Sequence, residues 1–394
     1  MAKIIVHIDL NAFFATCEEL RDPSLSKLPL IIGHSGRSGI VSTANYKARE
    51  YGIHSGQPTF QAQKLCPNVK IVEPDYSYYQ VMSTSFFCLI KRYCPLIEVA
   101  SIDECYADFT DVLKGSKDPL GYLRALQRKV KAELGLSCSM GVAPTKWLAK
   151  MASDMKKPMG LVTIRRKDIP SIIYPLPIES FWGIGKKTAP ILRGKGIATI
   201  GDLKHAFDTN NKEIIDLLGK FALTVEEWVN GKGSDTVHLE YEDPKSIGNS
   251  HTLYFDCDSL HEIENDLRHL AKEVSERAKA SHKKGYGITL TVKDTAFHLH
   301  TKAIKLEEST NSEETIFSKA VDLYTEHFEG KFMIRLVGIT LTRLVDPAQE
   351  TVQMSLWNYD EYVEQDKTKL LISEINRKMG EDVLMRGRQV KEKK

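Results

Sequence analysis

The chain has 394 residues, which exceeds one ordinary folding unit, so we expect several domains of about 100 to 200 residues each. Lys and Arg (54) nearly cancel Asp and Glu (52), which excludes a global basic excess as the source of any nucleic-acid affinity. The seven cysteines form no CxxC pair, so we expect neither disulfides nor structural zinc. The N-terminus lacks a signal-peptide pattern and no apolar stretch is long enough to cross a membrane, so we expect a cytoplasmic protein without membrane contact.

The first third of the chain predicts alternating strands and helices. Residues 3–8 indicate a short buried strand that ends at Asp9, and residues 12–20 a helix that stops at the Asp22-Pro23 break. Further elements follow in this order: strands in PLIIG (29–33) and GIVS (39–42), a helix in TANYKAREYG (43–52) and a long buried helix over 75–94.

The same alternation continues to about residue 165. LIEVA and ECYADF are typical of strands and flank residues 101–103, GYLRALQRKVKAEL predicts an amphipathic helix, SCSMGVA a strand, and TKWLAKMASDMKK a helix with Thr145 as its N-cap. This part of the chain is therefore predicted to be α/β.

Beyond residue 165 the predicted secondary structure changes twice. Residues 170–233 carry short helical patterns broken by glycines, which predicts a small all-helical domain, and the polar stretch 231–246 is typical of a linker. The remaining pattern predicts a β-α-β-β-α-β unit with strand 247–255, helix 258–281, strands 286–293 and 298–305, helix 313–328 and strand 332–344.

A sparse set of carboxylates indicates metal chemistry. Two Mg²⁺ ions about 3.5 to 4 Å apart can stabilise both the attacking and the leaving oxygen in phosphoryl transfer, and Mg²⁺ takes a few carboxylates together with substrate phosphates. Asp9 and the adjacent pair Asp103-Glu104 form such a set. Adjacent strand residues point to opposite faces, so this pair can share an ion only if it lies at a turn or a distorted strand end.

Four segments resemble, in order and spacing, the motifs of the Y-family translesion DNA polymerases: DLNAFFATCEEL (9–20), STANYKAREYGIHSGQP (42–58), SIDECY (101–106) and KMASDMKKPMG (150–160). The similarity continues through residues 177–203 and, more loosely, to about residue 345. It implies a multidomain α/β and α+β right-hand fold with palm, short fingers, helical thumb and little finger. The implied boundaries are a palm at 1–11 and 76–165, fingers at 12–75, a thumb with a helix-hairpin-helix at 166–232, a linker at 233–244, a little finger at 245–345 and a C-terminal tail at 346–394.

The resemblance implies a role for each matching residue. Asp9, Asp103 and Glu104 are the implied catalytic carboxylates, and with the backbone carbonyl of Leu10 they bind two Mg²⁺ ions. Asn11 stands where many members of the family carry a second aspartate, so it is not counted as a ligand. The implied nucleotide-binding set, in which Phe14 is the steric gate against the 2′-OH and Phe13 is mainly a packing residue, is Phe13, Phe14, Thr43, Tyr46, Arg49 and Lys157.

Two further segments suggest partners. GIGKKTA resembles a helix-hairpin-helix that meets DNA phosphates through Gly183, Gly185, Lys186 and Lys187. Residues 353–357 (QMSLW) resemble the peptide by which bacterial polymerases dock on a sliding clamp, with Gln353, Leu356 and Trp357 as the contacts. The expected partners are primer-template DNA, deoxynucleoside triphosphates and a clamp, bound by a monomer.

The predicted function is template-directed DNA synthesis of low fidelity, without proofreading, that bypasses damaged bases. Two alternatives stay open. A nucleotidyl cyclase also uses two metals and acidic residues on neighbouring strands, and a catalytically inactive adaptor could be recruited to damaged DNA. Activity that requires a DNA template separates both from a polymerase.

Overall fold

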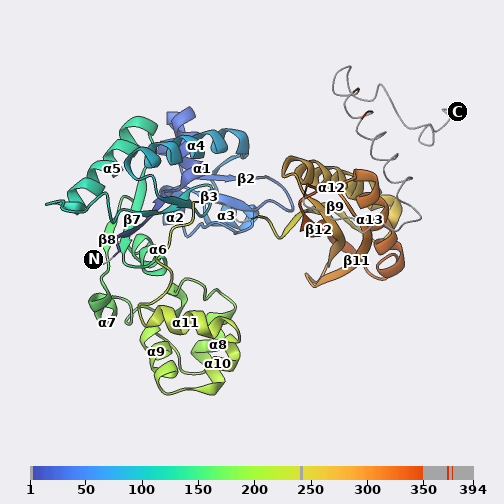
Figure 1. Cartoon of the computed structure of the whole chain (residues 1–394). Helices are drawn as coiled ribbons and strands as arrows, with labels where there is room; N and C mark the ends of the chain where they lie inside the picture. The colour runs from blue at the N-terminus through green and yellow to red at the C-terminus, as the bar shows by residue number, and fades with distance from the viewer. Residues whose placement is uncertain (1–2, 240–242, 349–370, 372–374, 376–394) are drawn as a thin grey trace. The chain divides into compact units, whose positions relative to one another are not determined.

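The computed structural model describes residues 3–239 and 243–348, together with Leu371 and Ile375. The chain divides into two compact units, residues 1–242 and 243–394, and each has its own core (Figure 1). None of the described helices is both long and apolar enough to cross a membrane.

The first unit contains two sheets and a set of helices of different lengths. Its strands are β1 (Ile5–Leu10), β2 (Leu30–Gly33), β3 (Val41–Ala44), β4 (Lys70–Val72), β5 (Ile97–Val99), β6 (Glu104–Asp108), β7 (Cys138–Ala143) and β8 (Leu161–Thr163). Its helices are α1 (Phe13–Arg21), α2 (Tyr46–Glu50), α3 (Thr59–Leu65), α4 (Tyr76–Tyr93), α5 (Pro119–Leu134), α6 (Lys146–Met155), α7 (Ile169–Ile172), α8 (Thr188–Gly194), α9 (Ile200–Asp208), α10 (Lys212–Leu218) and α11 (Phe221–Val229). Three 3₁₀ turns accompany them: Pro23–Lys27, Arg166–Asp168 and Ile178–Ser180.

A five-stranded sheet in the order β5-β6-β1-β7-β8 forms the centre of this unit. Helices α4 and α5 cover one face and α6 covers the other (Figure 1). Helix α6 begins where predicted, because the Thr145 side chain accepts a hydrogen bond from the Leu148 N–H. The central strand β1 is buried along its whole length, as the apolar run at 3–8 predicts.

Side chains of β1 alternate between the two faces of the sheet. Val6 and Ile8 pack into the core beneath α4 and α5, whereas Ile5 joins the core on the α6 side. By the same period of two, His7 and Asp9 face α6, although both are polar. A strand that is otherwise apolar thus presents two polar side chains to a single helix.

A smaller three-stranded sheet, β3-β2-β4, carries α2 and α3. The helix predicted over 43–52 is wrong at its start: Thr43 pairs with Ile32 as part of β3, and the helix begins only at Tyr46. The Asn45 side chain caps it by accepting a hydrogen bond from the Ala48 N–H. The sequence pattern predicted no element at α3, β4 or β8, and β4 and β8 are three-residue strands that pair in parallel with β2 and β7.

Residues 166–231 form the predicted all-helical part, α7 to α11, and no described residue in this range belongs to a strand. Its core is continuous with the α6 side of the five-stranded sheet. Trp147 of α6 stacks on Trp228 of α11, with ring centroids 5.8 Å apart and an interplanar angle of 18°. Aromatic packing therefore joins the helical part to the helix that faces His7 and Asp9.

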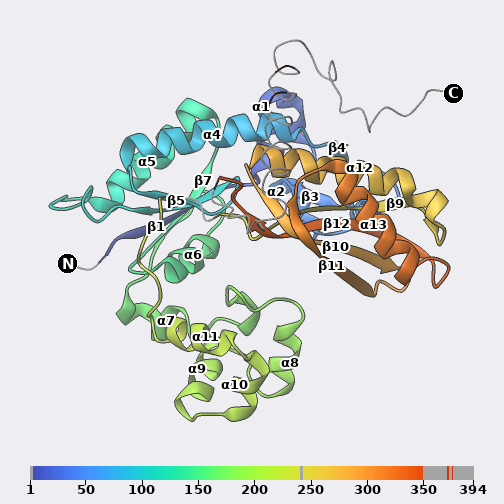
Figure 2. The ribbon, with the colours of Figure 1, turned by 45° about the vertical axis from the view of Figure 1, so that its right-hand side comes forward.

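The second unit has the predicted β-α-β-β-α-β order. Its elements are β9 (Ser246–Cys257), α12 (Leu260–Ala280), β10 (Lys284–Asp294), β11 (Leu299–Thr310), α13 (Glu313–His327) and β12 (Ile334–Val345). The strands form an antiparallel sheet in the order β11-β10-β12-β9, with α12 and α13 on one face (Figure 2). Its core lies between that face and the two helices.

Candidate active site

Asp9 and Glu104 lie side by side at the adjoining ends of two neighbouring strands inside the five-stranded sheet. They are register partners in the antiparallel pairing of β1 with β6. Glu104 opens β6, and two residues further on Tyr106 packs into the core on the α6 side, so Glu104 also faces α6. Two carboxylates from strands about 95 residues apart in sequence therefore meet beneath one helix.

Asp103 occupies a bend immediately before β6, so the acidic pair lies at a turn, which is the condition predicted for the two residues to share an ion. Residues 101–103 form no strand, and the Leu10 N–H donates to the Asp103 carbonyl at 2.9 Å. The Ser101 hydroxyl donates to Asp103 Oδ1 at 2.6 Å. Because the backbone leaves the regular strand here, Asp103 and Glu104 need not point to opposite faces.

Two lysines of the segment at 150–157 neutralise these carboxylates. Lys150 Nζ lies 2.8 Å from Glu104 Oε2 and 3.3 Å from Asp9 Oδ2, and Lys157 Nζ lies 2.8 Å from Asp9 Oδ1. Asp154 contacts both ammonium groups, at 3.6 Å from Lys150 and 2.8 Å from Lys157. Both oxygens of Asp9 are thus paired with ammonium groups.

The burial and charge of the site shift its pKa values in different directions. Burial raises the pKa of Asp103, and the carboxylates of Asp9 and Glu104 add to this against the Ser101 hydrogen bond. Burial also acts to raise the pKa of Glu104, but His7 and Lys150 outweigh it and lower that pKa to about 2. The pKa of Lys150 is raised, since neighbouring carboxylates overcome the burial that disfavours its charge. The site is a compact, highly charged network.

His7 is a functional candidate that the sequence motifs did not reveal. It is fully buried, and its Nδ1 lies 2.8 Å from the Ser153 hydroxyl, which itself donates to the Lys150 carbonyl at 2.9 Å. Ser153 therefore accepts from His7 Nδ1–H. His7 Nε2 lies 3.3 Å from Glu104 Oε2 but is not aligned for a hydrogen bond, and no other described residue satisfies it. The period of two places His7 and Asp9 on the same face of β1, but this pattern alone does not separate a site histidine from a core histidine.

These residues fit a divalent cation. His7, Asp9 and Glu104 each offer a ligand atom, and the three atoms lie within 4.8 Å of one another. Lysine ammonium groups balance the negative charge of the carboxylates and occupy the place of a cation. One ring nitrogen of His7 has no partner among the described residues. Asn11 is engaged elsewhere: it donates to the Ser139 hydroxyl and accepts from the Met159 N–H.

Helix α2 brings Tyr46 and Arg49 together. The Arg49 guanidinium lies 4.8 Å from the centroid of the Tyr46 ring, and Arg49 Nε donates to the Ala44 carbonyl. Burial raises the pKa of the Tyr46 hydroxyl, while the charges of Arg49 and Lys157 lower it. The buried Tyr46 hydroxyl has no hydrogen-bond partner in the described part of the chain, so it is available to a ligand. Thr43 lies on the neighbouring strand β3.

The two aromatic residues at the start of α1 differ in exposure. Phe13 is 2% exposed and belongs to the core, as predicted for a packing residue. Phe14 is partly buried and stacks on the Tyr79 ring, with centroids 4.4 Å apart and an interplanar angle of 14°. Stacking thus fixes the orientation of the Phe14 ring while leaving part of it open.

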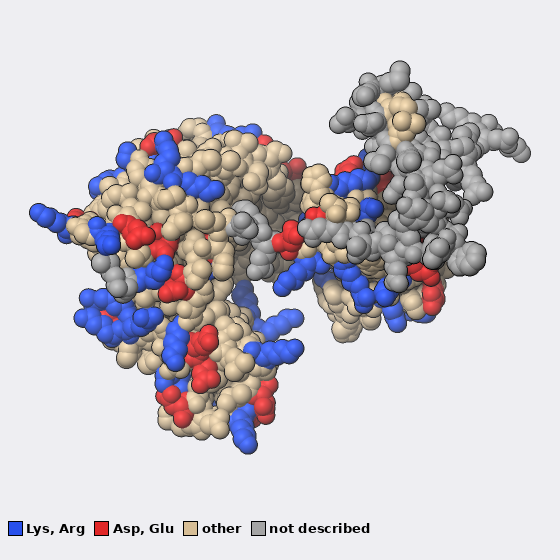
Figure 3. Space-filling view, viewed as in Figure 1, with Lys and Arg blue, Asp and Glu red and all other residues tan. Residues whose placement is uncertain are grey.

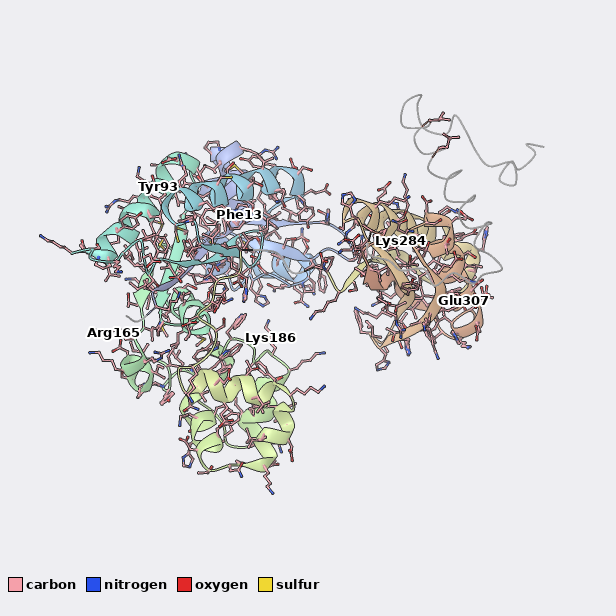
Figure 4. All side chains as sticks on the ribbon, viewed as in Figure 1. Phe13, Tyr93, Arg165, Lys186, Lys284 and Glu307 are labelled. Atoms are coloured by element: carbon pink, nitrogen blue, oxygen red, sulfur yellow. The ribbon has the colours of Figure 1, made fainter. Side chains whose placement is uncertain are left out.

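The predicted DNA-binding residues lie in the helical part, on the loop that enters α8. Gly183 has a φ of +105°, and a Cβ there would meet the Phe221 ring at 2.6 Å, so glycine is required at this position. Gly185 has open space around it, and the exposed side chain of Lys186 follows it on the same loop (Figure 4). Gln353, Leu356 and Trp357, the predicted clamp contacts, lie outside the described residues.

Comparison with known families finds three matches along the chain. Residues 8–154 match the impB/mucB/samB family, residues 166–197 the HHH motif of the same family, and residues 244–356 its C-terminal domain. The first match contains all three candidate carboxylates, and the second contains the loop at Gly183–Lys187.

Proteins of known name resemble the chain over most of its length. It is 35% identical over 393 residues to DNA polymerase IV of Bacillus anthracis, covering 98% of this chain and 94% of that relative, and 33% identical to DNA polymerase IV 1 of Bacillus subtilis (strain 168), covering 99% and 94%. Among solved structures, a Y-family DNA polymerase chimera of Dbh and Dpo4 superimposes with a TM-score of 0.77 at 26% identity, covering 87% of this chain and 99% of that one. The insertion ternary complex of Dbh DNA polymerase gives a TM-score of 0.60 at 26% identity, over the same shares of the two chains.

Proposed function

Since the chain belongs to the impB/mucB/samB family and is a DNA-directed DNA polymerase of the Y-family, we propose that it extends a primer by two-metal nucleotidyl transfer at Asp9, Asp103 and Glu104. The protein carries out template-directed synthesis of low fidelity, and its fold has the palm, fingers, thumb and little finger of translesion polymerases. The observation that carries the mechanism is the meeting of Asp9 and Glu104 across β1 and β6, with the Asp103 backbone tied to Leu10.

The proposed metal is Mg²⁺, held by the carboxylates of Asp9, Asp103 and Glu104 and the backbone carbonyl of Leu10. Carboxylate and carbonyl oxygens are the ligands that Mg²⁺ prefers, and triphosphate oxygens complete such sites. When bound, two ions supply charge to the attacking and leaving oxygens. The chain's own contribution is to hold acidic side chains from two strands in a buried, preorganised cluster. Before a metal binds, lysine ammonium groups neutralise the charge of these side chains.

Residues around the carboxylates would bind the incoming nucleotide. Lys157 lies 2.8 Å from Asp9, and the unpartnered Tyr46 hydroxyl and the Arg49 guanidinium offer donors of different shape to a triphosphate. Thr43 stands on the adjacent strand. Phe14, held by Tyr79, would close the pocket where a ribose 2′-OH would otherwise fit.

The helical part would hold the DNA backbone without reading its sequence. The residues proposed for this contact, which lie inside the matched HHH motif, are Gly183, Gly185, Lys186 and Lys187. On the face shown in Figure 3, basic and acidic side chains both occur, in keeping with the small net charge of +2. We also propose the domain boundaries that the family resemblance implies.

Single-nucleotide incorporation tests this function. We expect the wild type to add the template-directed deoxynucleotide to a primer in Mg²⁺, and Asp103→Asn and Glu104→Gln to lose at least about 10³-fold in rate while still binding primer-template. A nucleotidyl cyclase would turn over nucleotide without DNA. An inactive adaptor would bind the DNA and never extend it, and either result would overturn the proposal.

Docking on a sliding clamp is a separate proposal, supported by the sequence QMSLW at 353–357. A triple substitution to alanine at Gln353, Leu356 and Trp357 is expected to abolish the stimulation of synthesis by a bacterial clamp and to leave clamp-independent synthesis intact. Equal stimulation of the variant and the wild type would refute it.

A further inference from the structure

Lys150 lies where it competes with a cation. It sits on α6 with a side chain only 12% exposed, and its ammonium group bridges Glu104 Oε2 and Asp9 Oδ2. The two carboxylates come from neighbouring strands and belong to the cluster that fits a divalent ion. An ammonium group and a metal ion cannot both make close contacts with the same carboxylate oxygens without repelling each other.

The same helix carries a further carboxylate that can pair with the Lys150 ammonium group. Asp154 lies one turn beyond Lys150, with its carboxylate 3.6 Å from the Lys150 ammonium, and its side chain is 47% exposed. It also holds Lys157 at 2.8 Å. The spacing i, i+4 places Lys150 and Asp154 on one face of α6, so a small side-chain rotation moves the ammonium from Glu104 toward Asp154.

From this arrangement we propose that Lys150 is a built-in counter-ion that holds Asp9 and Glu104 together in the metal-free protein and withdraws to Asp154 when a divalent cation binds. The inference rests on the proposed two-metal function and assigns Lys150 and Asp154 roles as positioning residues. The positive charge of Lys150 offsets the repulsion between the Asp9 and Glu104 carboxylates, which would otherwise move them apart. Asp154 lowers the free-energy cost of displacing Lys150, because it offers the ammonium group another partner. Neither residue needs to touch the reacting atoms.

Direct metal binding by the full chain is the test, with Mn²⁺ as the probe and electron paramagnetic resonance of free Mn²⁺ as the readout. Lys150→Met keeps an unbranched side chain only one atom shorter and removes its charge. We expect this variant to bind Mn²⁺ about tenfold more tightly than the wild type, because no ammonium must be displaced. Its thermal midpoint without metal should be lower, and the rise on adding Mn²⁺ larger.

Two further variants sharpen the test. Lys146→Met removes the lysine one turn earlier on α6, which pairs with Glu98 at 2.6 Å and is 15% exposed, so it should lower the thermal midpoint without a comparable change in Mn²⁺ affinity. Asp154→Asn acts on a half-exposed residue and should weaken Mn²⁺ binding several-fold, since Lys150 then has only Asp9 and Glu104 as partners. If Lys150→Met does not fold, the weaker Mn²⁺ binding expected of Asp154→Asn tests the counter-ion role instead.

The outcomes separate this inference from the proposed function. Wild-type Mn²⁺ binding that Asp9→Asn abolishes, combined with unchanged or weaker binding in Lys150→Met, would overturn the counter-ion role and leave the metal site standing. Absence of any Mn²⁺ binding that depends on Asp9 would overturn both.

Discussion

At the scale of single residues, the site depends on which neighbours neutralise each carboxylate. Asp9, Asp103 and Glu104 could be picked out from sequence because acidic residues at strand ends and turns suit Mg²⁺, and family resemblance supplied their roles. His7 could not, because a lone histidine in an apolar strand is usually a core residue with its hydrogen bonds satisfied. Its unpartnered Nε2 beside Glu104 emerges only when β1, β6 and α6 are packed together.

Phe14 gives a prediction about sugar selection. Phe14→Ala removes the ring that stacks on Tyr79 and should increase ribonucleotide incorporation at least about tenfold relative to deoxynucleotides, because the space for a 2′-OH opens. Competing single-nucleotide insertions measure the ratio. Phe13→Leu is the matched control, since Phe13 is a core residue and its change should lower stability without altering the ratio. Unchanged selection in Phe14→Ala would remove Phe14 from the pocket.

Asp108 gives a prediction about pH. Burial acts to raise its pKa, but Lys3 at 2.5 Å and Thr110 lower it below the ordinary value. A carboxylate with a depressed pKa stabilises the fold above its unfolded pKa of about 3.9 and loses that contribution as the pH falls through the folded value. Lys3→Met should therefore lower the stability of the fold at pH 7, by a small amount because solvent screens the 43% exposed Lys3 side chain.

Urea unfolding of Lys3→Met and the wild type at pH 7 and near pH 3 measures this difference. The difference between the two proteins should be smaller at the lower pH than at pH 7. A difference that stays constant between the two conditions would show that the ion pair does not couple stability to pH.

At the scale of elements, helix α6 is the part of the chain on which the site is assembled. It carries Lys150, Ser153 and Asp154 against β1 and β6, and its Thr145 cap and apolar face were predictable from local sequence. Strands β4 and β8 were not predictable, because each has three residues and is defined by pairing with a strand far away in sequence. The start of α2 was misplaced because pairing of Thr43 with β2 overrode a locally helical pattern.

Gly141 tests how closely α6 must approach the sheet. A Cβ at this position of β7 would lie 2.0 Å from the Ala149 carbonyl oxygen and 2.4 Å from the Ser153 nitrogen, so α6 must move outward. Gly141→Ala should cost about 1 to 3 kcal/mol of stability and reduce nucleotide incorporation at temperatures where the variant remains folded. Gly194→Ala, where the added Cβ meets no atom within 4 Å, should change neither property. Wild-type activity in Gly141→Ala would mean that the close packing of α6 is dispensable.

At the scale of the whole molecule, the chain combines two units that each possess a core. The β-α-β-β-α-β order of the second unit followed from local periodicity alone, since its strands and helices are long and strongly patterned. The assignment of the first unit to catalysis did not follow from periodicity. It required motif resemblance, and the full-length similarity to DNA polymerase IV of Bacillus species shows that the chain is a polymerase.

The second unit is expected to fold by itself. All residues of its core cluster, from Ile247 to Leu341, come from the second unit itself. A fragment of residues 243–348 should therefore unfold in one cooperative transition with native-like helix and strand content, as monitored by circular dichroism during urea denaturation. A fragment that shows no cooperative transition would mean that the first unit is needed to stabilise it.

Primer extension on two templates that differ only in one abasic site tests the proposed activity most directly, with Mg²⁺ and with wild type and Asp103→Asn side by side. We predict that the wild type extends the primer on both templates, that it passes the abasic site, and that Asp103→Asn binds the same DNA without extending either primer. A wild type that binds primer-template yet extends neither primer would contradict the assignment as a polymerase, and extension that always halts at the abasic site would contradict the translesion role.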